Sequence, residues 1–551
     1  MSQPDRGARP VPQRAFADVA PTGARRSQGP GGHHPHGRPR RPLAERTFSG
    51  SVGWTLLSAL VPGLGLVKTR WRRLGLALTA VAVALLVVVG GAALVARGAL
   101  LSWITSPELL TALWVGLALF GVGWVFTVVA THLLTRPSPA SGVQRVAGSL
   151  LVGLISLGIA VPTFVGARSI HDTASLITAV FQDGTEPGAV PAPTFGNASD
   201  PWAHTARLNV LILGGDAGAD RVGTRTDTVI LASVNTRSGD TVLYSLPRQT
   251  LHMPFPEDSP LHDVWPNGFY LSGQEEGASM LNAMYAAVPV LAPDAIPASE
   301  DPGAKVLQLS VGEALGLQVD YYAMVNLDGF IELVNALGGI TVNINKPVPV
   351  GGKNPTYLGG SDGFPPDRWL TPGPNQHLNG YDALWFARGR YQSTDYERMS
   401  RQRCVIQAIS RQVNPATVLA NYEALTKAGQ NIVRTDVPNS LLPALLQLSG
   451  TVRSAPLRSI SFENAKDGFS TSRPDWDVVR ERVQESLDSA PSPTAAPAPT
   501  DGPTPTTSPT AAPEPAPTAS GPVVTEAPDG TRSVADECAY DPTLWDPTGP
   551  D

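Results

Sequence analysis

Cysteine and histidine are scarce in this chain of 551 residues. It contains only two cysteines, Cys404 and Cys538, and nine histidines, three of which lie together near the N-terminus. The cysteines lack CxxC spacing, and the remaining histidines are scattered. A zinc site or a Cys–His nucleophile pair therefore has little support in the sequence.

Acidic residues are nearly absent from residues 51–167, which are strongly apolar. A transmembrane helix needs about 20 apolar residues. The stretch 52–67 is interrupted by Pro62 and Gly63, and as a span it would put the basic residues after it opposite the basic N-terminus. We therefore interpret it as an interfacial or re-entrant segment. Three transmembrane helices are predicted within residues 50–168, at about 74–95, 109–134 and 146–165.

The N-terminal residues 1–49 contain nine arginines and three acidic residues. This pattern is typical of a disordered basic cytoplasmic tail, and we expect no nucleic-acid partner. Three spans place everything after Arg168 outside the cell, as a multi-pass protein of the cell membrane. The first strong apolar run begins too far from Met1 for a cleavable signal peptide, so we expect an anchored protein.

The rest of the chain divides by composition. Residues 169–205 contain several prolines and form a predicted spacer, whereas residues 206–488 have the mixed composition of a globular, extracytoplasmic catalytic domain. Residues 489–534 are mostly Pro, Ala and Thr, which predicts a disordered linker. Residues 535–551 form a C-terminal tail with aromatic residues that can dock on another part of the protein.

The globular part alternates strand and helix patterns. Residues 208–213 form an apolar run that ends in two glycines, which indicates a buried strand entering a turn. Residues 228–234 and 241–246 are further predicted strands, and helices are predicted at 305–317 and 327–337. Strands interleaved with helices predict an α/β fold, an α-β-α sandwich-like domain.

Charged residues gather next to the first three predicted strands. Loops at strand ends converge to form sites, so these side chains are candidates for one site. Arginine binds phosphate with a planar, always charged fork, and aspartate is a hard oxygen ligand for Mg²⁺. The first cluster consists of Asp216, Asp220, Arg221, Arg225, Asp227 and Arg248.

A second charged cluster lies between residues 388 and 402. Three of its members recur at positions i, i+3 and i+4, so one helix face can present them together. The alternative is an ordinary solvated basic face, balanced by Asp395 and Glu397. The second cluster consists of Arg388, Arg390, Asp395, Arg398, Arg401 and Gln402.

Several motifs occur in the order and with the gaps typical of the LytR-CpsA-Psr family. Residues 206–488 resemble that family, in an actinobacterial type, and the ordered set is far more specific than any single motif. The motifs are Leu211-Ile-Leu-Gly-Gly-Asp216, Arg225-Thr-Asp227-Thr228, Ser245-Leu-Pro-Arg248, Leu378-Asn-Gly-Tyr-Asp-Ala-Leu-Trp-Phe-Ala-Arg388-Gly-Arg390 and Asp395-Tyr-Glu-Arg398-Met-Ser-Arg401-Gln402.

The resemblance implies a phosphotransferase that moves a glycopolymer from an undecaprenyl-pyrophosphate carrier to peptidoglycan, with a membrane lipid as part of the donor. It implies Mg²⁺ as cofactor, held by Asp216 and Asp227. Asp227 and Asp395 are the candidates for the base that accepts the hydroxyl proton, with Arg225 and Arg248 beside them in the catalytic set. The implied pyrophosphate-binding residues are Arg221, Arg225, Arg248, Arg388, Arg390, Arg398 and Gln402.

The chain departs from the family pattern at two places. Gln249 stands where an Asp often follows the Pro-Arg pair, and the segment Met280-Leu281-Asn282 lacks the usual Lys. Two alternative functions remain open: a lipid-pyrophosphate phosphatase with water as acceptor, and a non-catalytic polyprenyl-lipid-binding regulator of envelope synthesis.

The two cysteines leave two alternatives. Outside the cell they can form a disulfide that ties the C-terminal tail to the domain. Otherwise Cys404 is a buried thiol and Cys538 an unrelated exposed one, and we favour this second interpretation.

Overall fold

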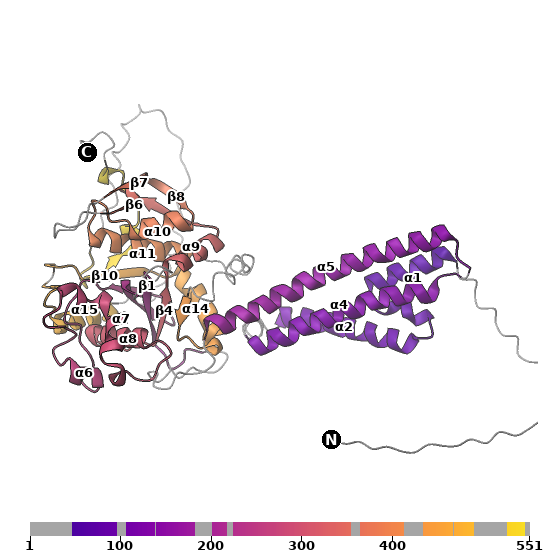
Figure 1. Ribbon diagram of the computed structural model, residues 1–551, viewed down its shortest axis with the longest axis horizontal. Coiled ribbons are helices and arrows are strands. Elements are labelled where there is room, and N and C mark those ends of the chain that lie inside the picture. Colours follow the sequence, from indigo (N-terminus) through magenta and orange to yellow (C-terminus); the bar gives the residue numbers. More distant parts are fainter. Residues whose placement is uncertain are drawn as a thin grey trace, which may run out of the picture.

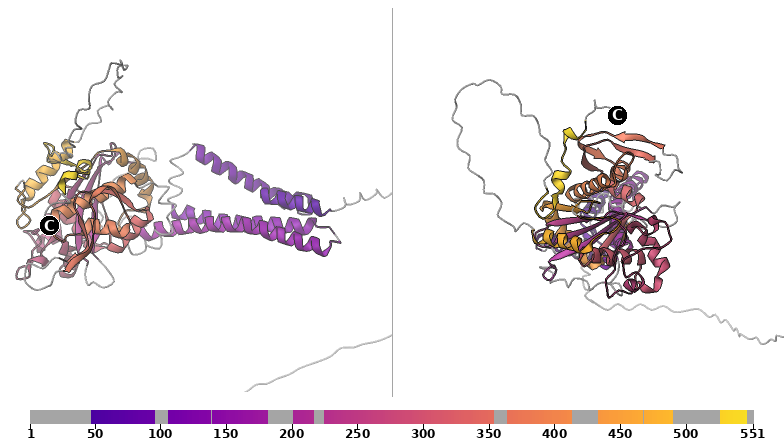
Figure 2. Two further views of the ribbon diagram at one scale, coloured as in Figure 1. Left: turned by 90° about the horizontal axis from the view of Figure 1, so that it is seen from above. Right: turned by 90° about the vertical axis from the view of Figure 1, so that its left-hand side faces the viewer.

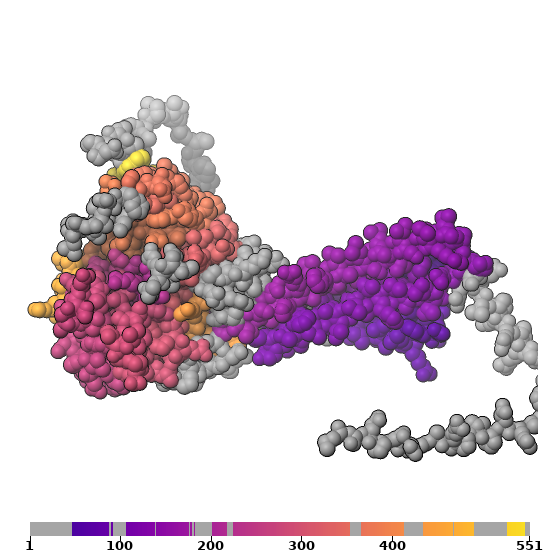
Figure 3. All heavy atoms as spheres, in the orientation of Figure 1, coloured from indigo at the N-terminus to yellow at the C-terminus, as the bar shows by residue number. Residues whose placement is uncertain are grey.

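The computed structural model describes residues 47–95, 106–137, 139–181, 201–216, 224–353, 364–412, 433–466, 468–489 and 526–545. In Figure 1 a bundle of helices projects from one side of an α/β domain. The space-filling view of Figure 3 shows the same elongated bundle beside the rounder domain.

The bundle contains the predicted membrane helices. Its long helices are α2 (Arg72–Val95), α4 (Pro107–Thr135) and α5 (Gly142–Val180), and each contains one of the predicted spans. Among the described residues, two helical stretches are long and apolar enough to cross a membrane, Pro107–Thr135 and Gly142–Ser175. The third span, in α2, stays a prediction.

The segment before α2 is a short helix followed by a turn. Helix α1 (Phe48–Leu60) ends before Pro62, and the 3-10 helix η1 (Leu64–Lys68) follows. Buried hydroxyl groups join this segment to α4, since the Ser58 hydroxyl donates to Thr127 at 3.3 Å and Trp124 donates to the Ser58 carbonyl at 3.1 Å. Such hydrogen bonds and small residues are typical of helix contacts in membranes. The interruption at Pro62 thus divides the apolar stretch 52–67, as the sequence predicts.

The domain is built on a mixed seven-stranded sheet, in the order β11-β10-β3-β2-β1-β4-β9. Antiparallel pairs join β1 to β2 and β2 to β3, whereas β1 pairs with β4, and β3 with β10, in parallel. The three strands predicted from the sequence are therefore neighbours at the centre of the sheet. The strands are β1 (Arg207–Gly215), β2 (Thr226–Asn235), β3 (Thr241–Ser245), β4 (Tyr321–Val325), β9 (Val433–Thr435), β10 (Leu457–Ser461) and β11 (Arg532–Ser533).

Helices cover both faces of this sheet, as the two views of Figure 2 show. Leu211 and Leu213 of β1 belong to a large core formed with α7 (Leu281–Leu291), α8 (Pro302–Leu315) and α15 (Trp476–Asp488). Ile212 points to the other face, where α11 (Asp395–Gln412) packs through Ile406. This alternation is the period of two expected of a strand buried on both faces. The α-β-α layering predicted from the sequence is confirmed.

A smaller subdomain surrounds α11. It comprises α9 (Leu327–Ala336), α10 (Gly380–Arg388) and two hairpin-like sheets, β5 (Ile340–Ile344) with β8 (Gly373–Leu378) and β6 (Val348–Lys353) with β7 (Phe364–Leu370). These elements share a second apolar core. The remaining short elements are α6 (Pro260–Val264), η2 (Glu276–Ala278), η3 (Pro293–Ala295), η4 (Asn439–Leu441), α14 (Leu442–Ser454), α16 (Val534–Glu537) and η5 (Pro542–Leu544).

The bundle meets the domain through apolar contacts at the end of α5. Ala174 and Ile177 of α5 are buried together with Leu110 of α4, and Leu442 at the start of α14 packs against them. Phe181, the residue after α5, contacts this cluster and also the core beneath β4. Helix α5 therefore continues past its apolar window and ends on the domain itself.

The C-terminal residues 526–545 are a folded part of the domain. Strand β11 pairs with β10 at the sheet edge, and Val534 is fully buried against the face that α11 covers. The expected disordered linker (489–534) and tail (535–551) thus contain a docked segment, since the sheet edge and the α11 face offer it backbone partners and apolar contacts. We call residues 526–545 the C-terminal strap.

A disulfide fixes the strap to α11, so our preference for two unrelated cysteines is wrong. Cys404 is bonded to Cys538. The residues that precede the two cysteines also pair, since the buried Arg403 guanidinium donates from Nε to Glu537 at 3.0 Å. Asn343 of β5 donates to the Cys538 carbonyl at 2.9 Å. A separation of 134 residues hides this pairing from any local pattern.

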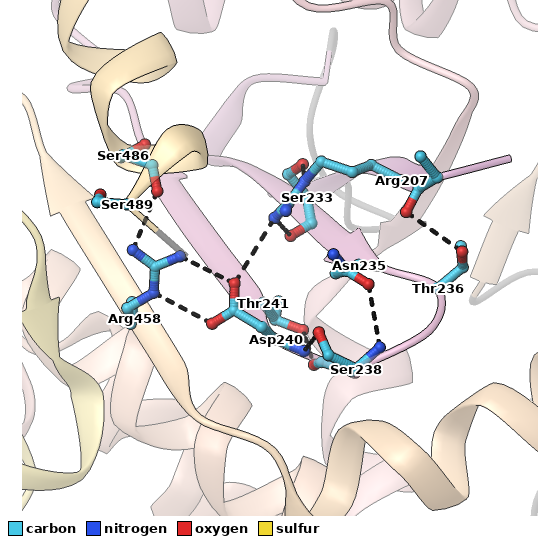
Figure 4. Close-up of polar contacts among 12 residues, drawn as sticks. Arg207, Ser233, Asn235, Thr236, Ser238, Asp240, Thr241, Arg458, Ser486 and Ser489 are labelled. Carbon is cyan, nitrogen blue, oxygen red and sulfur yellow. Dashed lines mark hydrogen bonds and ion pairs between the residues drawn. The ribbon is translucent and has the colours of Figure 1, made fainter. Parts of the chain in front are cut away.

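The other end of the strap is held by a partly buried arginine, Arg458, drawn in Figure 4. Arg458 of β10 donates to both carboxylate oxygens of Asp240, at 3.1 and 2.8 Å, and its Nη1 lies 3.2 Å from Asp529 of the strap. The same Nη1 donates to the Ser486 carbonyl at 3.0 Å near the end of α15. Arg458 therefore joins the β2–β3 turn, α15 and the strap.

We expect the disulfide to stabilise the domain. Cys538→Ser should lower the free energy of unfolding by about 2–4 kcal/mol, because the cross-link no longer restricts the unfolded chain. Thermal unfolding of the detergent-solubilised protein under oxidising conditions measures this loss. Reductant should lower the melting temperature of the wild type and leave that of Cys538→Ser unchanged; equal melting temperatures for both oxidised proteins would contradict the prediction.

Candidate functional site

Asp227 lies in a β-bulge at the start of β2. Gly215 of β1 pairs with Thr226 and Gly214 pairs with Thr228, so Asp227 is left out of the ladder. A bulge redirects the side chain of the extra residue. Two residues before Asp227, the backbone N–H of Arg225 donates to Asp216 Oδ1 at 2.8 Å, and the Asp216 N–H donates back to the Arg225 carbonyl at 3.0 Å. The two aspartates therefore stand at the same end of neighbouring strands.

Arg248 follows β3 and meets the Asp227 carboxylate. The Leu246 N–H donates to the Val229 carbonyl at 3.1 Å, which continues the β2–β3 pairing up to the segment that carries Arg248. Arg248 Nη1 then donates to Asp227 Oδ1 at 2.6 Å, and Asn282 Nδ2 donates to the same oxygen at 3.1 Å. Charge-assisted hydrogen bonds of this length are among the stronger ones in proteins.

Asp395 opens helix α11 and collects three guanidinium groups. Arg398, on the next turn, donates to both of its oxygens at 3.1 Å. Arg248 Nε and Arg390 Nη1 lie 3.5 and 3.4 Å from Asp395 Oδ1. A carboxylate in the first turn of a helix is also favoured by the helix dipole. We call Asp227, Arg248, Arg390, Asp395 and Arg398 the charge network.

The start of α11 is fixed by a capping box. Thr394 Oγ1 accepts from the Glu397 N–H at 3.1 Å, and Glu397 Oε2 accepts from the Thr394 N–H at 3.0 Å. These reciprocal bonds satisfy two backbone groups that a helix end leaves free. Arg398, with only 4% of its side chain exposed, reaches across to β2, where its Nη1 donates to the Asp227 carbonyl at 2.9 Å. The helix and the sheet are thus joined at the network itself.

The network shifts the acid–base behaviour of its members. Burial raises the pKa of the Asp227 carboxyl, but the charge of Arg248 and the hydrogen bonds from Arg248 and Asn282 lower it more, so the pKa lies below its ordinary value. Burial and the charges of Arg248 and Arg398 lower the pKa of Arg390. Asp227 is therefore ionised at neutral pH, paired with the partly exposed Arg248.

Two residues expected in the second cluster serve helix α10 instead. Arg401 Nε donates to the Phe386 carbonyl at 2.7 Å, and its Nη2 donates to the Gly389 carbonyl. Gln402 is buried and donates to the Ala387 carbonyl at 3.4 Å. The carbonyls at a helix C-terminus lack partners within the helix, and these side chains supply them. In this state Gln402 does not face the charge network.

Two other predicted residues, Arg225 and Arg388, lie in the sequence two positions before Asp227 and Arg390 of the network. The Arg388 guanidinium stands over the Trp385 ring, 5.0 Å from its centroid, and Arg225 is exposed. Arg221 lies outside the described residues, as does Asp220. The structure thus joins Asp227, Arg248, Arg390, Asp395 and Arg398 directly, with Asp216 on the adjacent strand end.

Asn282 belongs to the site but was not predicted from the sequence. It is the second residue of α7, almost fully buried, and its N–H donates to the Arg248 carbonyl at 3.1 Å while its side chain binds Asp227. The side-chain Oδ1 is buried with no donor in the described part of the chain. In the sequence, the segment Met280-Leu281-Asn282 stands out only because it lacks the usual Lys. The feature that could have indicated Asn282 is a polar amide at the start of an apolar helix.

The lowered pKa of Asp227 gives a pH-dependent contribution to stability. Its unfolded pKa is about 3.9, so the contribution is present above about pH 4 and is lost as pH falls through the lower folded value. Asp227→Asn should reduce the free energy of unfolding at pH 7 by about 1 kcal/mol or less, because the side chain is part-exposed. Urea unfolding at pH 7 and pH 3 measures the difference from wild type, which should shrink in acid.

Asp258→Asn is the matched control, because Asp258 is exposed and forms no hydrogen bond or ion pair within the described part of the chain. A difference between Asp227→Asn and wild type that grows from pH 7 to pH 3 would contradict the assignment.

Comparison with known proteins shows the family of this chain. The model of the LytR_cpsA_psr family matches residues 186–484, more than half of the chain. Biofilm regulatory protein A of Streptococcus mutans is 26% identical over 269 residues, which cover 47% of this chain and 57% of that protein. This chain therefore spans little more than half the length of that relative.

Two further proteins show the same likeness. The polyisoprenyl-teichoic acid–peptidoglycan teichoic acid transferase TagU of Enterococcus faecalis is 30% identical over 289 residues, 51% of this chain and 78% of that protein. The crystal structure of protein gbs0355 from Streptococcus agalactiae has 25% identity and a TM-score of 0.37, and covers 53% of this chain and 91% of that one. From the match over residues 186–484, the chain belongs to the LytR_cpsA_psr family.

Proposed function

We propose that this protein is a phosphotransferase that moves a glycopolymer from an undecaprenyl-pyrophosphate carrier to peptidoglycan during cell-wall assembly. The observation that carries the proposal is the charge network, in which three arginines from separate segments converge on Asp395 and Asp227. The TagU relative, named for transfer of a polyisoprenyl-linked teichoic acid to peptidoglycan, supports the choice of substrates.

The arginines of the network suit a pyrophosphate. Arg248 and Arg390 are partly exposed, whereas Arg398 is buried and fixed by Asp395. The two partly exposed guanidinium groups, beside the fixed guanidinium of Arg398, can exchange carboxylate for phosphate oxygens with little loss of hydrogen bonding. Arg225 and Arg388, each two residues from a member of the network in sequence, are our candidates for the outer phosphate oxygens, and Arg221 is the further candidate proposed from the sequence.

The residues near Asp227 fit a magnesium ion. Asp216 and Asp227 supply carboxylate oxygens at neighbouring strand ends, and the buried Asn282 Oδ1 beside Asp227 has no donor in the described part of the chain. Among the described residues, no group of three or more His, Cys, Asp or Glu side chains gathers. Mg²⁺ commonly binds one or two carboxylates and completes its shell with water and substrate phosphates. Bound there, it would neutralise charge on the pyrophosphate.

The chemistry we propose is an in-line substitution at phosphorus. A hydroxyl of a peptidoglycan sugar attacks the phosphorus nearest the glycopolymer, a new P–O bond forms, and the bond to undecaprenyl phosphate breaks. The arginines offset negative charge on the phosphoryl oxygens, which is the main form of help such reactions require. The hydroxyl proton goes to Asp227 or Asp395, and either must first lose an arginine partner to the substrate, because both accept from guanidinium groups here.

The cellular placement follows from the same proposal. A lipid-linked glycan and peptidoglycan meet on the outer side of the cell membrane, so we place the domain there, behind a multi-pass anchor. The two apolar helices Pro107–Thr135 and Gly142–Ser175 support an anchored protein. The end of α5 on the domain would hold the charge network at a fixed position relative to the lipid bilayer.

Arg248→Ala should abolish transfer without unfolding the domain. Removing one charged donor to developing phosphoryl charge costs on the order of 10²–10³ in turnover. The assay measures sugar attached to peptidoglycan by the full-length protein in detergent, from a polyprenyl-pyrophosphate glycan. Arg480→Ala is the matched control, because Arg480 has a similarly exposed, ion-paired guanidinium that binds Glu313 on the opposite face of the domain. Transfer by Arg248→Ala close to that of Arg480→Ala would remove Arg248 from the site.

Chelation should stop the reaction and Mg²⁺ should restore it. In the same assay we expect EDTA to reduce transfer to background, and excess Mg²⁺ to recover it in the wild type. Asn282→Leu, which keeps the size of the side chain but removes the Oδ1 ligand, should raise the Mg²⁺ concentration needed for half-maximal rate. Transfer at the full rate in EDTA would contradict the metal assignment but not the role of the arginines in the charge network.

A further inference from the structure

A pair of aromatic side chains stands beside the charge network and takes no part in the chemistry proposed above. Trp369 of β7 and Tyr391 have ring centroids 6.1 Å apart, in an edge-to-face arrangement at 70°. Trp369 is 40% exposed. Tyr391 directly follows Arg390, which binds Asp395. We call Trp369 and Tyr391 the aromatic edge.

Strand alternation explains why Trp369 faces outward. Leu370 is buried in the core of the smaller subdomain, and Arg368 pairs with Asp382 of α10. Successive side chains of a strand point to opposite faces, so Trp369 lies on the outer face of the β6–β7 hairpin. Its cross-strand partner is Pro349, which is buried and has no N–H to donate.

The backbone fixes the aromatic edge to the arginine that precedes it. A Cβ at Gly389 would lie 2.6 Å from the Pro349 carbonyl oxygen, so only glycine lets the hairpin approach this closely. The Ser393 N–H donates to the Arg390 carbonyl at 3.1 Å and closes a turn in which Gln392 has φ of 55°. A non-glycine residue in the left-handed region costs energy and persists where the surroundings fix it. Arg390 and Tyr391 are therefore presented together by one rigid turn.

We propose that the aromatic edge binds a sugar ring of the acceptor, the glycan strand of peptidoglycan, and places its hydroxyl beside the pyrophosphate. This proposal rests on the proposed function. A pyranose ring has a flat face of C–H groups and a rim of hydroxyls, which matches the exposed Trp369 ring beside the half-buried Tyr391, with the exposed Arg390 next to it in the chain. Trp and Tyr supply large contact areas with few rotatable bonds, and they contribute much of the binding energy at protein interfaces.

The position of the hairpin favours the acceptor over the donor. In Figure 1 the β6–β7 hairpin lies at the top of the domain, on the side of α10 away from the main sheet, whereas α5 joins the domain beside α14. The donor is held by its lipid in the membrane, and the peptidoglycan strand arrives from the wall. An exposed outer face also suits a long polymer better than a polyprenyl chain, which requires burial of its whole length.

The test measures acceptor binding without catalysis. Soluble glycan strands, prepared from peptidoglycan with the peptide stems removed, are titrated against the full-length protein by calorimetry. We expect Trp369→Ala and Tyr391→Ala each to weaken binding about tenfold or more. Trp369→Phe should recover most of the affinity, because it keeps the ring against Tyr391. Trp545→Ala is the matched control, since Trp545 is 39% exposed on the C-terminal strap.

Kinetics then separate acceptor from donor. We expect the two alanine variants to raise the KM for peptidoglycan with an unchanged KM for the polyprenyl-pyrophosphate glycan and an unchanged melting temperature. A raised KM for the donor alone would assign the pair to the donor glycan and overturn the proposal. Unchanged glycan affinity in both variants would also overturn it. Glycan binding that depends on Trp369 in a protein without transferase activity would refute the proposed function and leave the aromatic edge as a glycan site.

Discussion

The site depends on the carboxylates that offset the mutual repulsion of Arg248, Arg390 and Arg398. Like charges at close range cost a few kcal/mol per pair at a partly exposed site, by the order of magnitude of Coulomb's law at intermediate dielectric. Asp395 relieves this repulsion by accepting from Arg398 and lying within 3.5 Å of Arg248 and Arg390, while Asp227 holds the other end of Arg248. The carboxylates of the protein itself therefore hold the arginines in position.

Each element around the network has a part in that positioning. The bulge in β2 turns Asp227 out of the ladder, and the capping box fixes the first turn of α11. The C-terminal strap then braces the same helix, since Cys538 is bonded to Cys404, less than two turns beyond Arg398. A segment separated from the domain by a long Pro-rich stretch thus belongs to the scaffold of the site, and a fragment that ends at residue 488 would lack it.

Local sequence patterns predicted the central strands, the layered α/β fold and the arginine–aspartate clusters. Strand periodicity and charge at strand ends can each be recognised within a short stretch of sequence. The contacts that cross the fold were beyond those patterns. Arg401 and Gln402 share a helix face with Arg398, yet they donate hydrogen bonds to the carbonyls at the end of α10. Asn282 joins the site only because α7 begins against the Arg248 loop, and the disulfide joins residues 134 positions apart.

The most direct measurement is the fate of the donor's phosphates in the presence of peptidoglycan. The full-length protein, in detergent with Mg²⁺, is given a polyprenyl-pyrophosphate glycan labelled in the phosphate next to the sugar. Transfer across the charge network predicts that the label and the sugar appear together on peptidoglycan, with polyprenyl monophosphate released in equal amount. Label released as a soluble sugar phosphate, with none on peptidoglycan, would identify a hydrolase. Donor that is bound but unchanged would identify a receptor, and either result would contradict the account.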